Sequence, residues 1–200
     1  MGPARTTLSP MGKLYEEIDA RLRGWIERQH LFFVGTAPLA ADGHVNVSPK
    51  GDLRWFRVLG PREVAYLDFV GSGAETIAHL RENGRIVVML CAFDGPPRIV
   101  RLHGLGTVLL PSDPRFAELL ERFDAPEHAL RSLIRVDVER IADSCGYGVP
   151  LMRFERKRTQ YDQWVDRKVR DGGLAAYVAD NNAVSTDGLP AIDQERLSAS

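Results

Sequence analysis

The sequence has very little cysteine, almost no net charge and no long apolar run, and each shortage excludes a class of protein. Two cysteines, Cys91 and Cys145, are too few for a disulfide framework. Lys and Arg number 26 against 27 Asp and Glu, so the net charge of -1 gives no field that attracts nucleic acid or an anionic membrane. The longest clearly apolar run, residues 86–93, is far shorter than the roughly twenty residues that span a bilayer. Because the N-terminus also lacks a signal-like stretch, we expect a cytoplasmic protein without nucleic-acid or membrane partners.

The composition is that of an ordinary globular domain, with 44% hydrophobic, 26% charged and 8% aromatic residues. No internal repeat or linker divides the sequence, so we expect a single domain over residues 1–200. Its core, with an N-terminal helix, is expected over about residues 10–155. A helical extension packed on that core would follow over 156–190, and a polar tail would end the chain over 191–200.

Helical periodicity is clearest near the N-terminus. Ser9 and Pro10 suit the start of a helix, and apolar residues such as Leu14, Ile18 and Leu22 recur at helical spacing to near residue 30. We therefore predict one amphipathic helix over this stretch.

From residue 31 onward, short β-branched and aromatic runs alternate with turn residues such as Asp42-Gly43, which is typical of antiparallel strands. The predicted strands span residues 31–37, 45–49, 55–59, 64–69, 85–93, 99–110 and 134–141. Helices are predicted over 74–83, 114–123 and 159–169, and turns over 180–182 and 185–188. Because a single helix crosses between strands, the predicted fold class is α+β and mainly β, an antiparallel barrel with flanking helices.

The first candidate site is the strand that carries Asn46, Ser48 and Lys50. Side chains alternate along a strand, so these three share one face, while Val45 and Val47 are expected to enter the core on the other. An amide, a hydroxyl and an ammonium group on one face can hydrogen-bond a polar ring edge or a phosphate. The alternative is an ordinary solvated hairpin face.

The second candidate site is the glycine-rich segment over residues 71–76. Ser72 and Glu75 have the spacing of a capping box, which places free helix amides over residues 73–76, and Gly71 and Gly73 add no side chain that would keep a phosphate away. Simple helix initiation also explains this pattern. A degraded dinucleotide fingerprint, with Asp94 about twenty residues on, is a further alternative, but a doubly wound fold needs several helical crossovers.

In the segment 145–150, two glycines bracket Tyr147, which indicates a backbone wrapped closely around a ligand or another subunit. Cys145 is interpreted as a buried structural thiol, because no histidine lies in a recognisable partner motif for a nucleophile. The histidines form no i, i+4 pair and no Cys-x-x-Cys accompanies them, so no metal site is predicted. The His103-Gly104 step is expected to be a bulge, and Trp164 a packing residue.

Four segments in order, HVNVSPKG (44–51), GSGAETIAHLRENG (71–84), FDGPPRIVRLHGLG (93–106) and SCGYGVP (144–150), closely resemble the pyridoxamine 5'-phosphate oxidase-related, FMN-binding split-barrel family. The likeness covers about residues 10–190. It implies an antiparallel split barrel that forms a homodimer with FMN sites at the subunit interface. It also implies an oxidoreductase acting on a small-molecule substrate or electron donor.

The resemblance assigns the candidate residues to parts of FMN. Val47, Ser48, Lys50 and Gly51 would lie along the isoalloxazine ring and ribityl chain, Gly71, Ser72, Gly73 and Thr76 would receive the phosphate, and Tyr147 and Val149 would contribute to the partner's pocket. No catalytic side chain is assigned, since the flavin supplies the redox chemistry.

The sequence also departs from true pyridoxamine-phosphate oxidases. They carry an Arg-Lys pair after the serine of the phosphate turn, where this chain has Gly73-Ala74, and their substrate-binding Arg and His have no counterpart over residues 153–168. Pyridoxamine-phosphate oxidation itself is therefore not expected. The remaining alternatives are a flavin-binding module without turnover, the same fold with deazaflavin or haem, and a dimer whose barrel holds nothing.

Overall fold

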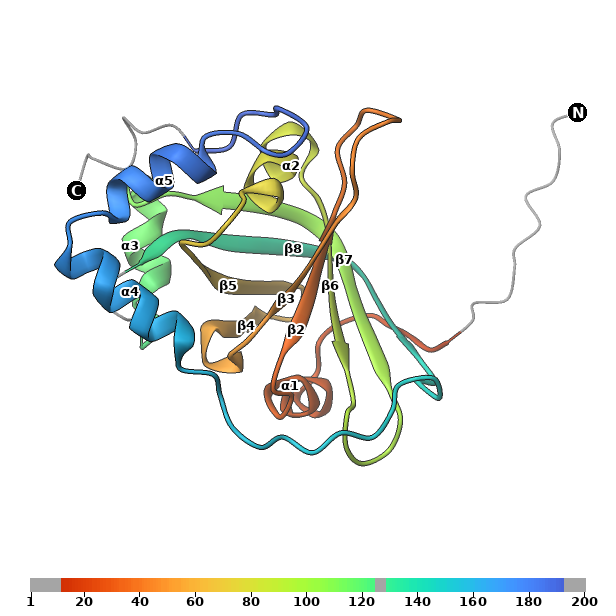
Figure 1. Cartoon of the computed structure of the whole chain (residues 1–200). Coiled ribbons are helices and arrows are strands. Elements are labelled where there is room, and N and C mark those ends of the chain that lie inside the picture. Colours follow the sequence, from red (N-terminus) through yellow and green to blue (C-terminus); the bar gives the residue numbers. More distant parts are fainter. Residues whose placement is uncertain (1–11, 125–128, 193–200) are drawn as a thin grey trace, which may run out of the picture.

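One antiparallel sheet of eight strands forms the framework of the computed structural model, which describes residues 12–124 and 129–192 (Figure 1). The strands are β1 (Leu14–Tyr15), β2 (Phe32–Thr36), β3 (Asn46–Lys50), β4 (Phe56–Gly60), β5 (Glu63–Phe69), β6 (Arg85–Cys91), β7 (Ile99–Leu109) and β8 (Leu130–Ser144). The helices are α1 (Ala20–Glu27), α2 (Glu75–Asn83), α3 (Pro114–Leu120), α4 (Gln160–Arg170) and α5 (Leu174–Asn182), with a 3-10 turn, η1 (Leu53–Trp55).

The sheet is a barrel that is split between its two end strands. Its order is β3-β2-β6-β7-β8-β5-β4, with β1 beside β8, so β3 and β4 are its ends. The ring centroid of Phe32 in β2 nevertheless lies 5.0 Å from the ring centroid of Phe56 in β4. It lies 5.3 Å from the ring centroid of Tyr66 in β5. Across the split, β2 therefore packs against β4 and β5 through buried aromatic side chains instead of a hydrogen-bonded ladder. The mainly β, antiparallel prediction is confirmed, and the doubly wound alternative is wrong.

All seven predicted strands are present, but the predicted N-terminal helix forms only over its second half, as α1 (Ala20–Glu27). Leu14 and Tyr15 pair with Ala142 and Ile141 as β1, because strand pairing there replaces the weak helical preference. The helix begins only at α1, where the Asp19 carboxylate accepts a hydrogen bond from the Leu22 amide at 2.7 Å. Ser9 and Pro10 lie outside the described residues.

The bulge predicted at His103 is confirmed by a register shift between His103 and Gly104 in the β7–β8 pairing. A Cβ at Gly104 would collide with the backbone oxygen of Asp137 on β8, so only glycine fits this close approach. The bulge lets the two longest strands bend around the core.

The C-terminal helices pack beside α2 at one end of the barrel (Figure 1). Val165 of α4 and Val178 of α5 join a buried cluster with Val70 and Ile77, and Trp164 packs against it as predicted. The turn predicted over residues 180–182 is wrong, because these residues end α5. The turn over residues 185–188 forms, with the Gly188 amide donating to the Ser185 carbonyl at 2.9 Å.

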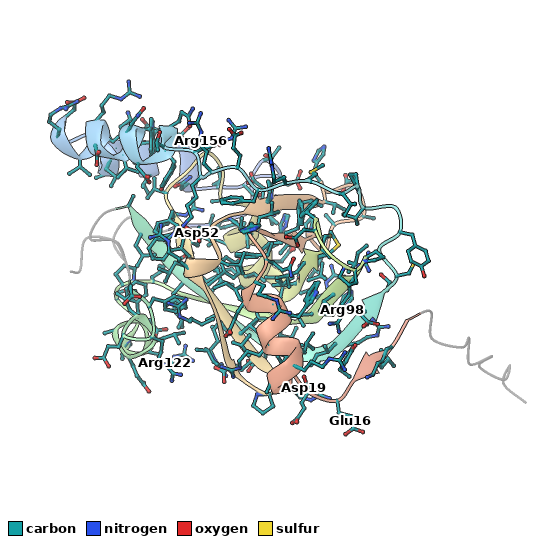
Figure 2. All side chains as sticks on the ribbon, turned by 90° about the horizontal axis from the view of Figure 1, so that it is seen from below. Glu16, Asp19, Asp52, Arg98, Arg122 and Arg156 are labelled. Atoms are coloured by element: carbon teal, nitrogen blue, oxygen red, sulfur yellow. The ribbon has the colours of Figure 1, made fainter. Side chains whose placement is uncertain are left out.

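An extended segment, residues 145–159, connects β8 to α4 beneath the barrel (Figures 1 and 2). Its later part, residues 151–159, is exposed throughout, and an ion pair between Lys157 and Asp52 ties it to the loop after β3. Among the helices of the described ranges, none has the length and apolarity to cross a membrane.

Candidate functional site

The inward face of β3 is polar and its outward face is apolar. Asn46, Ser48 and Lys50 point inward and are partly buried, whereas Val45 and Val47 are 71% and 65% exposed. The shared face of the three polar residues is confirmed, and the expected burial of the two valines is wrong. β3 is an end strand with polar partners on its inner side, so its apolar residues face outward.

A chain of hydrogen bonds joins β3 to the first turn of α2. The Ser48 hydroxyl donates to Asn46 Oδ1 at 3.0 Å, and Asn46 Nδ2 donates to Thr36 Oγ1 at 3.2 Å and to Thr76 Oγ1 at 3.1 Å. Thr36 Oγ1 in turn lies 3.0 Å from Nδ1 of the fully buried His79. Burial lowers the pKa of His79, so its ring is neutral. Two predicted residues, Ser48 and Thr76, are thus linked through Asn46.

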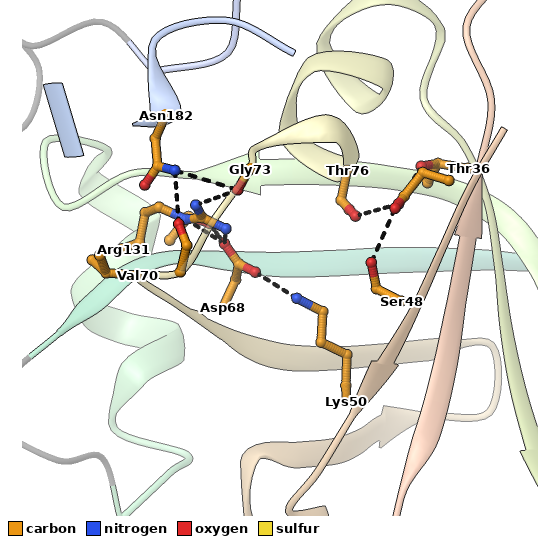
Figure 3. Close-up of polar contacts among 12 residues, drawn as sticks. Thr36, Ser48, Lys50, Asp68, Val70, Gly73, Thr76, Arg131 and Asn182 are labelled. Carbon is orange, nitrogen blue, oxygen red and sulfur yellow. Dashed lines mark hydrogen bonds and ion pairs between the residues drawn. The ribbon is translucent and has the colours of Figure 1, made fainter. Parts of the chain in front are cut away.

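A second network surrounds Asp68 on β5, which is buried (Figure 3). Its carboxylate accepts hydrogen bonds from Lys50 Nζ at 3.1 Å, from Arg131 Nε at 2.9 Å and from the Ser132 hydroxyl at 3.0 Å. Burial by itself would raise the pKa of Asp68, but the two cations and their hydrogen bonds lower it to about 2. One carboxylate against two cations leaves the cluster with a net positive charge.

The glycine-rich segment runs between these two networks, from Val70 to the start of α2 (Figure 3). Arg131 Nη1 donates to the Gly73 carbonyl at 2.9 Å, which connects the charged cluster directly to this segment. Gly73 has a φ of +84°, and a Cβ there would collide with the Glu75 carboxylate. The positive φ favours glycine at this position, whereas the Glu75 carboxylate is the end of a flexible side chain that can move.

The predicted capping box between Ser72 and Glu75 is wrong. Helix α2 starts at Glu75 with Ala74 as its N-cap and no side-chain cap, because Glu75 Oε1 instead accepts hydrogen bonds from the Thr186 amide at 3.3 Å and hydroxyl at 3.1 Å. Across the described chain, no partner is present for the backbone N–H groups of residues 71–77. Seven consecutive donors beside a positively charged cluster form a cradle for an anion.

Sequence comparison identifies the family. The sequence model described as pyridoxamine 5'-phosphate oxidase matches residues 18–145. The chain belongs to the pyridoxamine 5'-phosphate oxidase family. A pyridoxamine 5'-phosphate oxidase family protein of Aspergillus flavus, ustO, is 41% identical over 192 residues, covering 89% of this chain and 77% of its own.

Solved structures with a similar backbone are more distant in sequence. A HupZ variant from Group A Streptococcus is 19% identical, with a TM-score of 0.48, over 63% of this chain and 98% of its own. An FMN-binding protein from Syntrophomonas wolfei is 18% identical, with a TM-score of 0.45, over 66% of this chain and 85% of its own.

Most of the residues predicted from the resemblance to the pyridoxamine 5'-phosphate oxidase family lie together. They are Ser48 and Lys50 with the adjoining Gly51, and Gly71, Ser72, Gly73 and Thr76. Val47 points away from this group. Asp68 and Arg131 were not found from the sequence. Asp68 could have been found, because it is the one charged residue in the otherwise apolar run 64–69.

Two predicted residues, Tyr147 and Val149, are not brought to this site within one chain. Both follow the end of the 15-residue β8, whereas Arg131 lies near its start. They also lie just beyond the part of the chain that matches the pyridoxamine 5'-phosphate oxidase family.

The backbone around Gly146 lies close to another segment of the same chain, whereas the predicted neighbour was a ligand or another subunit. A Cβ at Gly146 would lie 2.7 Å from the backbone nitrogen of Arg98. The predicted burial of Cys145 is wrong, because this residue is exposed. No group of three or more His, Cys, Asp or Glu side chains in the described ranges is arranged to hold a metal ion.

Proposed function

We propose that this chain binds FMN, with the phosphate in the cradle of residues 71–77 and the ring and ribityl chain along the inward face of β3. The observation that carries the proposal is the run of unpartnered N–H groups next to a buried cluster of net positive charge. A phosphate dianion satisfies both the donors and the charge. The family membership supports the same ligand, because the resemblance implies FMN.

Each residue of the site has a defined task under this proposal. Lys50 uses one ammonium proton for Asp68, so two remain for an anionic ligand, and Arg131 adds charge behind Gly73. Ser48 and Asn46 offer a hydroxyl and an amide to polar atoms of the ring or ribityl chain. When bound, FMN supplies hydride or electron transfer, and we propose an FMN-dependent oxidoreductase of a small molecule.

We further propose that the protein is a homodimer with the flavin sites at the subunit interface. Val47 on the outer face of β3 is 65% exposed, and Tyr147 and Leu151 beyond β8 are 82% and 80% exposed. Apolar side chains this exposed favour cover by a second copy. Gel filtration should show a dimer that Val47→Lys weakens; a wild-type monomer that binds FMN normally contradicts this arrangement.

The decisive experiment is an absorbance spectrum of the purified protein, followed by heat release and chromatography of any bound compound. We expect FMN, and FMN titration into cofactor-free protein should restore the flavin spectrum. A released deazaflavin or haem, or a colourless protein that does not bind added FMN, contradicts the proposal. Reduction of the bound flavin by nicotinamides then separates an oxidoreductase from a flavin-binding module without turnover.

A further inference from the structure

Three carbonyl groups in and beside the glycine-rich segment, those of Val70, Gly71 and Gly73, accept hydrogen bonds from side chains of the C-terminal helices. The Tyr161 hydroxyl of α4 donates to the Val70 carbonyl at 2.8 Å. Asn182 Nδ2, at the end of α5, donates to the Gly71 carbonyl at 2.9 Å and to the Gly73 carbonyl at 3.3 Å (Figure 3). The C-terminal helices therefore contact the three carbonyls of this turn.

These contacts determine where the N–H groups point. In a trans peptide, the carbonyl of one residue and the N–H of the next point in opposite directions. Holding the carbonyls of Val70, Gly71 and Gly73 toward α4 and α5 therefore turns the N–H groups of the following residues away from those helices. Two of the donors in the anion cradle, those of Ser72 and Ala74, follow the carbonyls that Asn182 binds.

The segment cannot hold this orientation by itself. Gly71 and Gly73 have the widest backbone freedom of any residue type, and ordering each residue costs about 1–2 kcal/mol of conformational entropy. Within the described residues, Tyr161, Asn182 and Arg131 are the side chains that donate hydrogen bonds to the carbonyls of residues 70–73. The two helix residues therefore supply most of the restraint.

Asn182 is buried at a cost that its own hydrogen bonds do not fully offset. Its side chain is fully buried. Nδ2 donates to the two glycine carbonyls, and Oδ1 has no hydrogen-bond partner among the described residues. A buried unpartnered polar atom is unfavourable, so the benefit of this amide lies in the carbonyls that it holds. Burial also raises the pKa of Tyr161, which keeps its phenol protonated as a donor.

We propose that Tyr161 and Asn182 are positioning residues that orient the turn for a phosphate group and so make the site selective for phosphorylated over unphosphorylated flavin. The inference rests on the proposed function, because it takes the phosphate of FMN as the anion. Both residues lie outside the family match, which ends at residue 145. The C-terminal extension therefore supplies the positioning residues, while the groups that bind the phosphate lie in the barrel.

The test compares FMN with riboflavin, which lacks only the phosphate, on full-length cofactor-free protein. Asn182→Ala should weaken FMN binding about tenfold and leave riboflavin binding within about twofold. Tyr161→Phe should act in the same direction by about threefold, and it keeps the ring packed between Phe69 and Trp164 so that the fold is preserved. Asn181→Ala is the matched control, since this exposed neighbour donates to the Tyr177 carbonyl instead.

The outcomes separate the two proposals. Wild-type protein that does not bind FMN overturns the proposed function, and equal wild-type affinity for FMN and riboflavin overturns the phosphate assignment. If wild-type protein prefers FMN and both variants keep that preference, the positioning role alone is wrong. An equal loss of both ligands in Tyr161→Phe, with a lower melting temperature, shows a purely structural role and also overturns it.

Discussion

Lys50 on β3 and Asp68 on β5 form an ion pair, Nζ to Oδ1 at 3.1 Å, between two strands that are not neighbours in the sheet. The pair spans the interior near the split of the barrel, where the two ends of the sheet lack hydrogen bonds to each other. Because Arg131 also binds Asp68, Lys50 is the cation that the carboxylate can release with least loss. Lys50 is therefore available to a ligand without leaving a buried charge unpaired.

Lys50→Met should lower FMN affinity about tenfold, because it removes the surplus positive charge of the cluster. The melting temperature of the cofactor-free protein should fall little, since Arg131 and Ser132 still bind Asp68. Flavin titration and thermal melting check both effects. Lys157→Met is the control, because Lys157 pairs with Asp52 outside the site. A collapse of the fold in Lys50→Met would make Lys50 a structural residue.

Acid should remove a defined part of the stability. The pKa of Asp68 is about 2 in the folded chain against an ordinary 3.8, so its pairing contributes about 2 kcal/mol that is present above pH 5 and lost as the pH falls toward 2. Asp68→Asn should cost about 3–5 kcal/mol at pH 7, because it leaves two cations without their carboxylate. Urea unfolding should show that the difference in free energy of unfolding between wild type and Asp68→Asn becomes smaller at low pH.

The control for the Asp68 experiment is Asp52→Asn, which breaks more exposed ion pairs with Arg54 and Lys157. Its cost should stay below about 1 kcal/mol. An equal difference in the free energy of unfolding between wild type and Asp68→Asn at pH 7 and at pH 3 would show that the carboxylate charge does not stabilise the cluster.

Gly73→Ala should reduce FMN affinity and cost about 1–2 kcal/mol of folding stability. The residue has a φ of +84°, which residues with a Cβ rarely adopt, so the turn must shift and its N–H groups move out of place for the phosphate. Gly188→Ala separates the two effects, because Gly188 also has a positive φ, of +76°, but has no neighbouring atom within 4 Å of its added Cβ. Comparable FMN loss in both variants would remove Gly73 from the cradle.

Glu75→Gln should tighten FMN binding about threefold. Its carboxylate lies directly against Gly73 in the first turn of α2, so a phosphate placed there meets a like charge. The stability loss should be small, about 0.5 kcal/mol, from the missing negative charge at the helix start. Glu82→Gln at the other end of α2, where Glu82 accepts from the Leu39 amide, should leave affinity unchanged. Weaker binding in Glu75→Gln would place the phosphate elsewhere.

Local sequence patterns predicted those features that depend on neighbouring residues. The seven strands follow from β-branched runs between turns, and the shared face of Ser48 and Lys50 follows from strand alternation. Alternation cannot tell which face is inside, so the position of Val47 was predicted wrongly. That choice depends on β3 being an end strand, which the order of the whole sheet decides.

The partners of the site residues depend on long-range packing, which no local pattern contains. Arg131 reaches Asp68 from 63 residues away because β8 pairs with β5. Asn182 reaches Gly71 across 111 residues because α5 packs on α2, and the sequence around it had predicted a turn. Helix α5 was missed because Asp180 and its neighbouring asparagines have low helical preference.

The route of the chain between β8 and α4 separates the barrel from the helices that hold its turn. Residues 151–159 are exposed, so a protease cut there would break the covalent link without disturbing the buried cluster around Val165 and Val178. The contacts left between the barrel and the helical pair then include that cluster and the hydrogen bonds of Tyr161 and Asn182. If Tyr161 and Asn182 orient the turn as proposed, substitutions in the appended helices would change which ligand is accepted while the barrel sequence stays the same.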